Sequence, residues 1–280
     1  MTFYKYNGAG NDFLIADNRD GEIRLSAEYI AKICDRHYGV GADGVMLLGA
    51  GHDGFDFTMD YYNADGSGGM MCGNGGRCIV AFASYLGLKP ASTDLCWRFL
   101  GPDGEHRASV LASEGNSMTV KLKMIDVTTA RHYDRLENVA HPVSGWFVNT
   151  GTRHFVSFVD SPVDAKFVEE EGCLLRRSRE FAPAGTNVNF ALRGNPLKVR
   201  TFEKGVEAET CACGTGVTAT AIAAWLDGVV PASCETGTGS VHYEVDALND
   251  RLAVDFVPGP LFTNVWLTGP ATLVAKIGIL

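Results

Sequence analysis

The sequence lacks the features of membrane, nucleic-acid-binding and secreted proteins. No apolar run approaches the roughly 20 residues that a membrane-spanning helix needs. The first eight residues hold no basic segment followed by an apolar stretch, as a secretory signal would. Acidic residues outnumber basic ones, 33 to 24, and no basic stripe with interleaved aromatic residues occurs, which argues against a nucleic-acid or anionic-membrane binder. We therefore expect a cytoplasmic protein with neither partner.

The eight cysteines also lack the spacing of a zinc site. Cys211-x-Cys213 and Cys72-x5-Cys78 both depart from the C-x2-C pattern of zinc knuckles. In a cytoplasmic chain of 280 residues, eight cysteines are a poor disulfide framework. We expect no metal, and a metal-thiolate protein is the weakest of the alternatives considered.

Glycine is abundant, at 33 of 280 residues, and it gathers in two similar segments. Cys72-Gly73-Asn74-Gly75 and Cys213-Gly214-Thr215-Gly216 each lead into a run of apolar and small residues. The first run closes at Gly87 and the second at Gly228, at the same distance from the cysteine. Positions 72 and 213 thus define an offset that also aligns Gly10–Ile15 with Gly151–Val156.

Two segment pairs that share one offset indicate an internal duplication. We predict an N-terminal half at residues 1–127 and a C-terminal half at 128–269, each long enough for its own core. The C-terminal strand at 270–280 is a candidate to return to the first half.

The apolar patterns predict mostly strands, with one prominent helix in each half. Apolar residues alternate with polar ones at 118–124, 241–245 and 252–256, as in half-buried antiparallel strands. The segment after each Cys-Gly-x-Gly is apolar or small nearly all round, which is typical of a buried helix. Ser26 to His37 is predicted as a surface helix with Ser26 as its N-cap. The fold class is therefore α+β, with two pseudo-symmetric domains, each a curved, mainly antiparallel sheet around a central buried helix.

Each Cys-Gly-x-Gly segment should lie at the start of its buried helix. There the first N–H groups have no internal partner and the helix dipole is positive, so the amides can hold a carboxylate and the thiol is expected to be acidified. If the halves face one another, Cys72 and Cys213 would flank one α-carbon. One thiolate would remove its proton while the other thiol protonates the opposite face, which inverts the centre. The hypothesis is a cofactor-independent amino-acid racemase or epimerase.

Other interpretations use only part of this pattern. A single cysteine before a helix is more often a packing residue. A papain-like nucleophile would need a partnered base, for which His154 is a candidate, but that reading ignores the duplication. A non-catalytic amino-acid binder is a further alternative, although the loss of one thiol would be expected in such a protein.

Seven motifs, in order, make the chain resemble the diaminopimelate epimerase family of pyridoxal-phosphate-independent racemases. The resemblance spans essentially the whole chain. The motifs are Gly8-Ala9-Gly10-Asn11-Asp12-Phe13, Asn63-Ala64-Asp65-Gly66-Ser67, Cys72-Gly73-Asn74-Gly75, Asn187-Val188-Asn189-Phe190, Phe202-Glu203-Lys204-Gly205, Glu209-Thr210-Cys211-Ala212-Cys213-Gly214-Thr215-Gly216 and Thr268-Gly269-Pro270-Ala271.

The resemblance implies an isomerase that interconverts LL- and meso-diaminopimelate in lysine and peptidoglycan precursor biosynthesis, commonly as a homodimer and without a cofactor. It implies Cys72 as the base and Cys213 as the acid for the LL isomer. It further implies that backbone donors hold the reacting carboxylate, that three asparagines contact the substrate, and that two residues position or tune the reacting groups. The carboxylate donors are Gly73, Asn74, Gly214 and Thr215. The asparagines are Asn11, Asn63 and Asn187. The positioning or tuning residues are His154 and Glu203, and Glu203 is also counted among the substrate contacts.

Three positions depart from the family pattern. Thr152 replaces an expected asparagine contact, and Lys204 replaces an arginine, which keeps the charge but loses the bidentate fork. Gly44 stands where some members have a polar substrate contact. We keep Thr152 and Lys204 as predicted substrate contacts. Because all three lie toward the non-reacting end of the substrate, a racemase of a different amino acid on the same scaffold is the nearest alternative.

Overall fold

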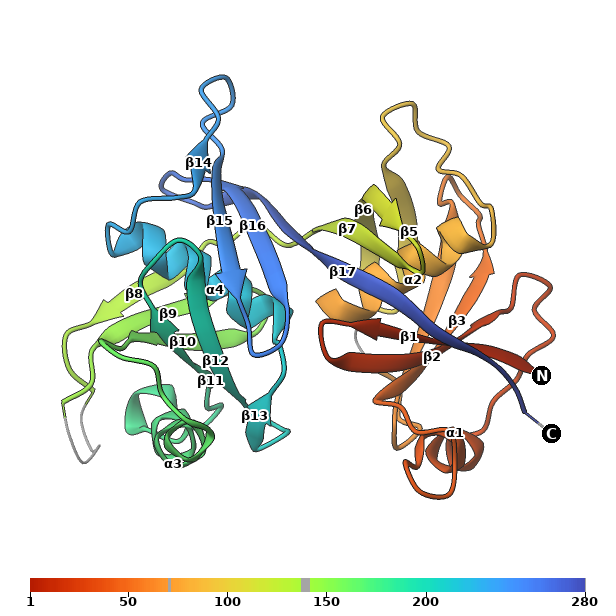
Figure 1. The fold of residues 1–280 in the computed structure, drawn as a ribbon, viewed down its shortest axis with the longest axis horizontal. Helices are drawn as coiled ribbons and strands as arrows, with labels where there is room; N and C mark the ends of the chain where they lie inside the picture. Colours follow the sequence, from red (N-terminus) through yellow and green to blue (C-terminus); the bar gives the residue numbers. More distant parts are fainter. Residues whose placement is uncertain (70–71, 137–141, 280) are drawn as a thin grey trace. The chain divides into compact units, whose positions relative to one another are not determined.

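The computed structural model describes residues 1–69, 72–136 and 142–279, and the chain divides into two compact units. Unit 1 comprises Met1–Lys123 with Thr268–Leu280, and unit 2 comprises Met124–Leu267. The long strand β17 (Thr263–Gly278) therefore begins in unit 2 and ends in unit 1 (Figure 1).

Unit 1 is a closed ring of strands. From β1 to β6, antiparallel pairs (β1–β2, β3–β4 and β5–β6) alternate with parallel pairs (β2–β3 and β4–β5), and β6–β7 is a further antiparallel pair. The ring closes because β17 pairs with both β7 and β1. Its elements are β1 (Thr2–Gly8), β2 (Asn11–Asp17), α1 (Ala27–Cys34), β3 (Gly44–Ala50), β4 (Phe57–Asn63), α2 (Gly73–Tyr85), β5 (Trp97–Gly101), β6 (Gly104–Glu114) and β7 (Ser117–Lys123).

Unit 2 repeats this order of pairings. β9–β10 is antiparallel, β10–β11 parallel, β11–β12 antiparallel, β12–β15 parallel and β15–β16 antiparallel. Its elements are β8 (Ala130–Tyr133), β9 (Gly145–Asn149), β10 (Arg153–Phe158), α3 (Ala165–Arg176), the short 3-10 helix η1 (Arg179–Phe181), β11 (Asn187–Leu192), β12 (Leu197–Glu203), β13 (Ala208–Thr210), α4 (Gly214–Leu226), β14 (Ser233–Cys234), β15 (Val241–Asp246) and β16 (Arg251–Val257). The predicted α+β class, with one sheet around one helix in each half, is confirmed.

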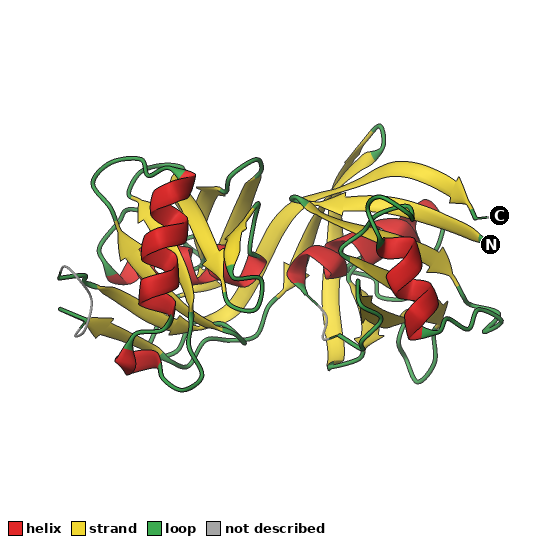
Figure 2. Cartoon of the chain, turned by 90° about the horizontal axis from the view of Figure 1, so that it is seen from below, coloured by secondary structure: helices red, strands yellow, loops and turns green. Residues whose placement is uncertain are grey.

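A buried helix forms the centre of each unit (Figure 2). Residues 73–83 of α2 are buried, and α2 contacts β1, β2, β3, β6 and β7. Residues 216–224 of α4 are buried, and α4 contacts the corresponding strands of unit 2 from β9 to β12, together with β15 and β16. Burial removes the apolar side chains of both helices from water, which stabilises the unit around each helix.

Helix α1 is shorter than predicted. Ser26 is its N-cap, as expected, and its hydroxyl accepts a hydrogen bond from the Tyr29 amide at 3.2 Å. The helix ends at Cys34, however, and not at His37. The reason is Asp35, whose carboxylate accepts hydrogen bonds from the amides of residues 37 and 38 at 2.7 and 2.6 Å. A side chain that accepts from the amides two and three residues ahead turns the backbone out of the helix.

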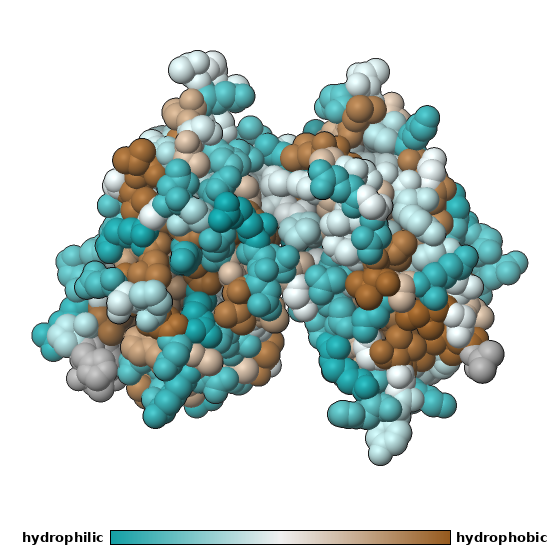
Figure 3. All heavy atoms as spheres, viewed as in Figure 1, coloured by the Kyte–Doolittle hydropathy of each residue, from teal (hydrophilic) through white to brown (hydrophobic). Residues whose placement is uncertain are grey.

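Polar side chains cover much of the face shown in Figure 3, with hydrophobic ones gathered in smaller patches. In the part of the chain that the structure describes, no helix is long and apolar enough to cross a membrane.

Candidate active site

Cys72 caps the start of α2. Its backbone is extended, with φ −99° and ψ 152°, and its sulfur accepts a hydrogen bond from the Gly75 amide at 3.2 Å. A Cβ at Gly75 would lie only 3.4 Å from this sulfur and 3.3 Å from the sulfur of Met46. Glycine thus allows the first turn of the helix to approach the thiol. An amide that donates to sulfur favours the thiolate.

A chain of hydrogen bonds runs beside Cys72. Nη2 of Arg77 donates to Oδ1 of Asn74 at 2.9 Å, Nδ2 of Asn74 donates to Oδ1 of Asn11 at 2.5 Å, and Nδ2 of Asn11 donates to the Asp43 carboxylate at 2.9 Å. A guanidinium can only donate and a carboxylate can only accept, so the orientation of both amides is fixed. The structure therefore brings together the predicted residues Asn11 and Asn74.

Ion pairs hold the Asp43 carboxylate, which is the last acceptor in this series of hydrogen bonds. Arg36 forms ion pairs with Asp43 at 2.6 Å and with Asp12 at 2.8 Å, and Lys5 pairs with Asp12 at 2.8 Å. Burial opposes ionisation of Asp12, but the hydrogen bonds from Arg36 and Lys5 outweigh it and hold the pKa of Asp12 below its usual value. Asn11 is thus adjacent to a network of paired charges.

Asn63 lies at the end of β4, opposite Gly44 on β3. Its side-chain amide donates to the Ser67 hydroxyl at 3.0 Å, within the turn that follows the strand. A Cβ at Gly44 would lie 2.6 Å from the Tyr62 carbonyl oxygen, so the backbone would have to shift to admit any side chain there. This close approach accounts for glycine at position 44, and the substrate contact of Asn63 stays a prediction.

Cys213 caps α4 in unit 2, at the position equivalent to Cys72. Its sulfur lies 3.3 Å from the Thr215 hydroxyl. Burial and then the Glu203 carboxylate raise the pKa of the Cys213 thiol, against the smaller opposite effects of Thr215 and the Gly216 amide. The prediction that the helix N-terminus acidifies the thiol is therefore wrong for Cys213, because desolvation and a neighbouring negative charge outweigh the helix dipole.

His154 on β10 is fully buried next to this helix start. Its Nε2 lies 2.9 Å from the hydroxyls of both Thr152 and Thr215, and its Nδ1 lies 3.1 Å from the Asn189 amide nitrogen. Burial lowers the pKa of His154 to about 3, so the ring is neutral at physiological pH. A ring of such low basicity is poorly matched to the general base of a papain-like thiol, for which a pKa near the working pH is needed.

The buried His154 predicts an acid-sensitive fold. Below its ordinary pKa of 6.5, the unfolded chain takes up a proton that the folded ring does not, so stability falls as the pH falls from 6.5 towards about 3. At pH 5 this costs about 2 kcal/mol relative to pH 7. Urea unfolding of the wild type and His154→Gln at both pH values measures it. A loss of the same size in both proteins would contradict the assignment.

The remaining predicted residues of unit 2 lie at one end of β10, β11 and β12. Asn187 accepts from the Lys204 amide at 2.8 Å and donates to the Arg153 carbonyl at 3.0 Å. The Lys204 ammonium donates to the Ala184 carbonyl at 3.1 Å. Glu203 accepts from the Thr210 hydroxyl at 2.6 Å. Asn187 therefore ties the strand ends together in addition to any contact with substrate.

Sequence reasoning did not identify Arg77, Asp43, Asn189 or Thr201. Arg77 could have been noticed as the one charged residue in an otherwise apolar helical segment. Asn189 could have been noticed because it alternates with Asn187 on one strand and so faces the same side. Asp43 and Thr201 offer no comparable signal, since their partners lie far away in the sequence.

Among residues 1–69, 72–136 and 142–279, no group of three or more His, Cys, Asp or Glu side chains could hold a metal ion.

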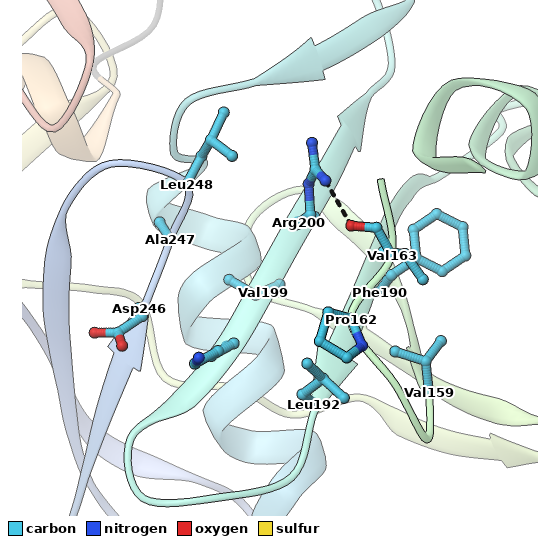
Figure 4. A pocket seen from close by; sticks show the side chains of 11 residues that line it. Val159, Pro162, Val163, Phe190, Leu192, Val199, Arg200, Asp246, Ala247 and Leu248 are labelled. Atoms are coloured by element: carbon cyan, nitrogen blue, oxygen red, sulfur yellow. Dashed lines mark hydrogen bonds between the residues drawn. The ribbon is translucent and has the colours of Figure 1, made fainter. Parts of the chain in front are cut away.

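Unit 2 has a mainly apolar pocket beside Arg200, whose guanidinium donates to the Val163 carbonyl at 2.6 Å (Figure 4). Cys213 and its neighbours do not line this pocket in the described structure.

Comparison with known proteins assigns the chain to a family. The profile of the family described as diaminopimelate epimerase matches residues 3–120 and 146–260, which include both cysteine segments. The chain belongs to the diaminopimelate epimerase family. It is accordingly an isomerase, as the resemblance implied.

Curated relatives named diaminopimelate epimerase match along nearly their whole length. The Flavobacterium psychrophilum protein is 38% identical over 100% of both chains. The Chlorobaculum tepidum protein is 39% identical over 96% of this chain and 98% of its own, and the Aquifex aeolicus protein is 38% identical over 96% and 94%.

Solved structures share the fold at low identity. A phenazine biosynthesis protein of the PhzF family from Bacillus anthracis has a TM-score of 0.69 at 14% identity, over 100% of this chain and 99% of its own. A probable proline racemase from Agrobacterium radiobacter also has a TM-score of 0.69 at 14% identity, over 100% and 92%. These likenesses concern the two-domain α+β fold alone.

Proposed function

We propose that the protein interconverts LL- and meso-diaminopimelate without a cofactor, in the synthesis of lysine and peptidoglycan precursors, with Cys72 and Cys213 as its two acid–base groups. The observation that carries the proposal is the repeated arrangement of a cysteine and glycine amides at the start of a buried helix, once in each unit. The substrate is supported by curated relatives that are named diaminopimelate epimerase and match this chain over nearly its full length.

The proposed reaction needs one thiol on each face of the α-carbon, and each helix start supplies one of them. The amides of Gly73 and Asn74, with those of Gly214 and Thr215, hold the reacting carboxylate and stabilise the negative charge that develops on it. For the LL isomer, the Cys72 thiolate removes the α-proton and the Cys213 thiol delivers one to the other face. In the meso-to-LL direction the two roles exchange.

The non-reacting end of the substrate would be bound by Asn11, Asn63, Thr152, Asn187 and Lys204. Lys204 supplies a charge but no bidentate fork to a carboxylate. This difference keeps a racemase of another amino acid as the second candidate function. Both thiols are present, which disfavours a binder without catalysis.

Release of an α-deuterium label distinguishes the two candidate substrates. LL-diaminopimelate labelled at its α-carbons is expected to lose deuterium to water far faster than labelled L-amino acids of other kinds, and meso-diaminopimelate should form at a matching rate. No turnover of diaminopimelate, together with rapid turnover of another amino acid, would rule out the proposed substrate while retaining the chemistry.

We also propose that the protein works in the cytoplasm, as a homodimer. Light scattering of the purified full chain should give about twice the mass of the 30.1 kDa chain. A monomeric mass at working concentrations with full activity would contradict the dimer.

A further inference from the structure

A buried polar network lies behind Cys213, and nothing in the proposed reaction so far uses it. His154 and Asn189 are fully buried, and Thr201 is nearly so. The network lies close against the first turn of α4, because a Cβ at Gly216 would come 2.5 Å from Oδ1 of Asn189. Buried polar groups at such close range must satisfy one another's hydrogen bonds, so the donor and acceptor at each contact can be assigned.

The orientation of the Asn189 amide follows from its neighbours. Its nitrogen lies 3.2 Å from the carbonyl oxygen of Phe155, which can only accept a hydrogen bond. Its oxygen accepts from the Thr201 hydroxyl at 3.0 Å. The amide nitrogen therefore donates one hydrogen to the Phe155 carbonyl and the other to Nδ1 of His154, 3.1 Å away.

The protonation of the His154 ring follows in turn. Since Nδ1 faces an N–H donor, it must accept, and the single proton of the neutral ring is on Nε2. The single N–H at Nε2 is then shared between two acceptors, the hydroxyl oxygens of Thr152 and Thr215, each 2.9 Å away.

The Thr215 hydroxyl completes the chain. A hydroxyl has two acceptor lone pairs and one proton. The oxygen of Thr215 accepts from the Thr152 hydroxyl at 3.0 Å and from Nε2 of His154, so both lone pairs are used. Its own proton is left for the sulfur of Cys213 at 3.3 Å.

We infer that Asn189 is a positioning residue that fixes the tautomer of His154 and thereby commits the Thr215 hydroxyl to donate to the Cys213 sulfur. The inference rests on the proposed function, in which Cys213 must be stable both as thiol and as thiolate. The neighbouring Glu203 carboxylate favours the thiol, and the Thr215 hydroxyl, which donates to the sulfur, favours the thiolate. A group with an acceptor on one side and a donor on the other can work in both directions of a reversible proton transfer.

The first test is the nitrogen NMR spectrum of His154 in the full-length protein. The wild type is expected to show a neutral ring with its proton on Nε2 across pH 6–8. In Asn189→Asp the carboxylate can only accept at Nδ1, so the proton of the neutral ring should move to Nδ1. A wild-type ring protonated on Nδ1, or an unchanged tautomer in Asn189→Asp, would overturn the inference.

The second test is the alkylation rate of Cys213 by iodoacetamide as a function of pH, read by mass spectrometry of its peptide. Thr215→Val should raise the pKa of the thiol and slow alkylation near neutral pH about tenfold, which corresponds to one pKa unit. Asn189→Asp should slow it similarly, since the Thr215 proton would turn to the bare Nε2. Thr215→Ser keeps the hydroxyl and should alkylate at close to the wild-type rate.

Thr220→Val is the matched control, because Thr220 lies on the same helix as Thr215 but its hydroxyl donates to the Gly216 carbonyl within the helix. This control should change neither the His154 spectrum nor the alkylation rate. An equal slowing in Thr220→Val would mean that loss of packing is the cause, and wild-type alkylation in Thr215→Val would refute the donor. Neither test needs turnover, so a failure of diaminopimelate as substrate is distinguishable from a failure of this inference.

Discussion

Replacing either Cys72 or Cys213 with alanine is expected to reduce net inversion of diaminopimelate by about 10²- to 10⁴-fold, the usual contribution of a positioned acid or base. Each stereoisomer presents its α-proton to one sulfur only, and the new proton must come from the other. Removal of one thiol therefore slows inversion in both directions. Chiral chromatography of the products from each isomer measures the loss.

Two other cysteines provide controls of the same chemical change. Cys96 in unit 1 and Cys211 in unit 2 are free and partly exposed, and neither lies at the start of a buried helix. Cys96→Ala and Cys211→Ala should keep near wild-type rates. If Cys72→Ala or Cys213→Ala also kept the full rate, the two-thiol mechanism would be refuted.

Arg77→Met is expected to lower the free energy of unfolding by about 3 kcal/mol. The Arg77 guanidinium is fully buried and donates to Oδ1 of Asn74 and to the carbonyls of Gly73 and Pro270. Methionine fills much of the volume but leaves these acceptors without their donor. Urea unfolding monitored by circular dichroism measures the loss.

The surface pair of Arg19 and Asp17 gives a control for loss of charge. Arg19 is exposed and Asp17 is partly exposed, so Arg19→Met should cost less than about 1 kcal/mol. Arg77→Lys keeps the charge without the planar fork and should fall between the two. A cost for Arg77→Met as small as that of Arg19→Met would show that the buried network does not stabilise unit 1.

The repeat made much of the fold predictable. Cys72 and Cys213 each precede a helix that is apolar on nearly all faces, and one offset relates α2 to α4 and β2 to β10. The strands over 118–124, 241–245 and 252–256 follow from period-two alternation. The end of α1 could not be predicted from apolar spacing, because Asp35 stops the helix through its own side chain.

The candidate site was less predictable than the fold. Motifs located Asn11, Asn74, His154 and Thr215, but not the hydrogen bonds that orient them. Those bonds come from Arg77, which is 3 residues from Asn74, and from Asp43 and Asn189, which the fold brings close from 32 and 35 residues away in the chain. The pKa of Cys213 was predicted in the wrong direction, since position at a helix start was visible in the sequence and the burial beside Glu203 was not.

Proton exchange in deuterated water tests the two-thiol mechanism most directly. Each pure stereoisomer is incubated with the wild-type protein, and both isomers are analysed for deuterium at low conversion. The mechanism predicts a product that has deuterium at the inverted α-carbon and a remaining substrate that is almost unlabelled, because one sulfur removes the proton and the other supplies a deuteron. A product that retains the original proton, or substrate and product labelled equally from the start, would contradict it.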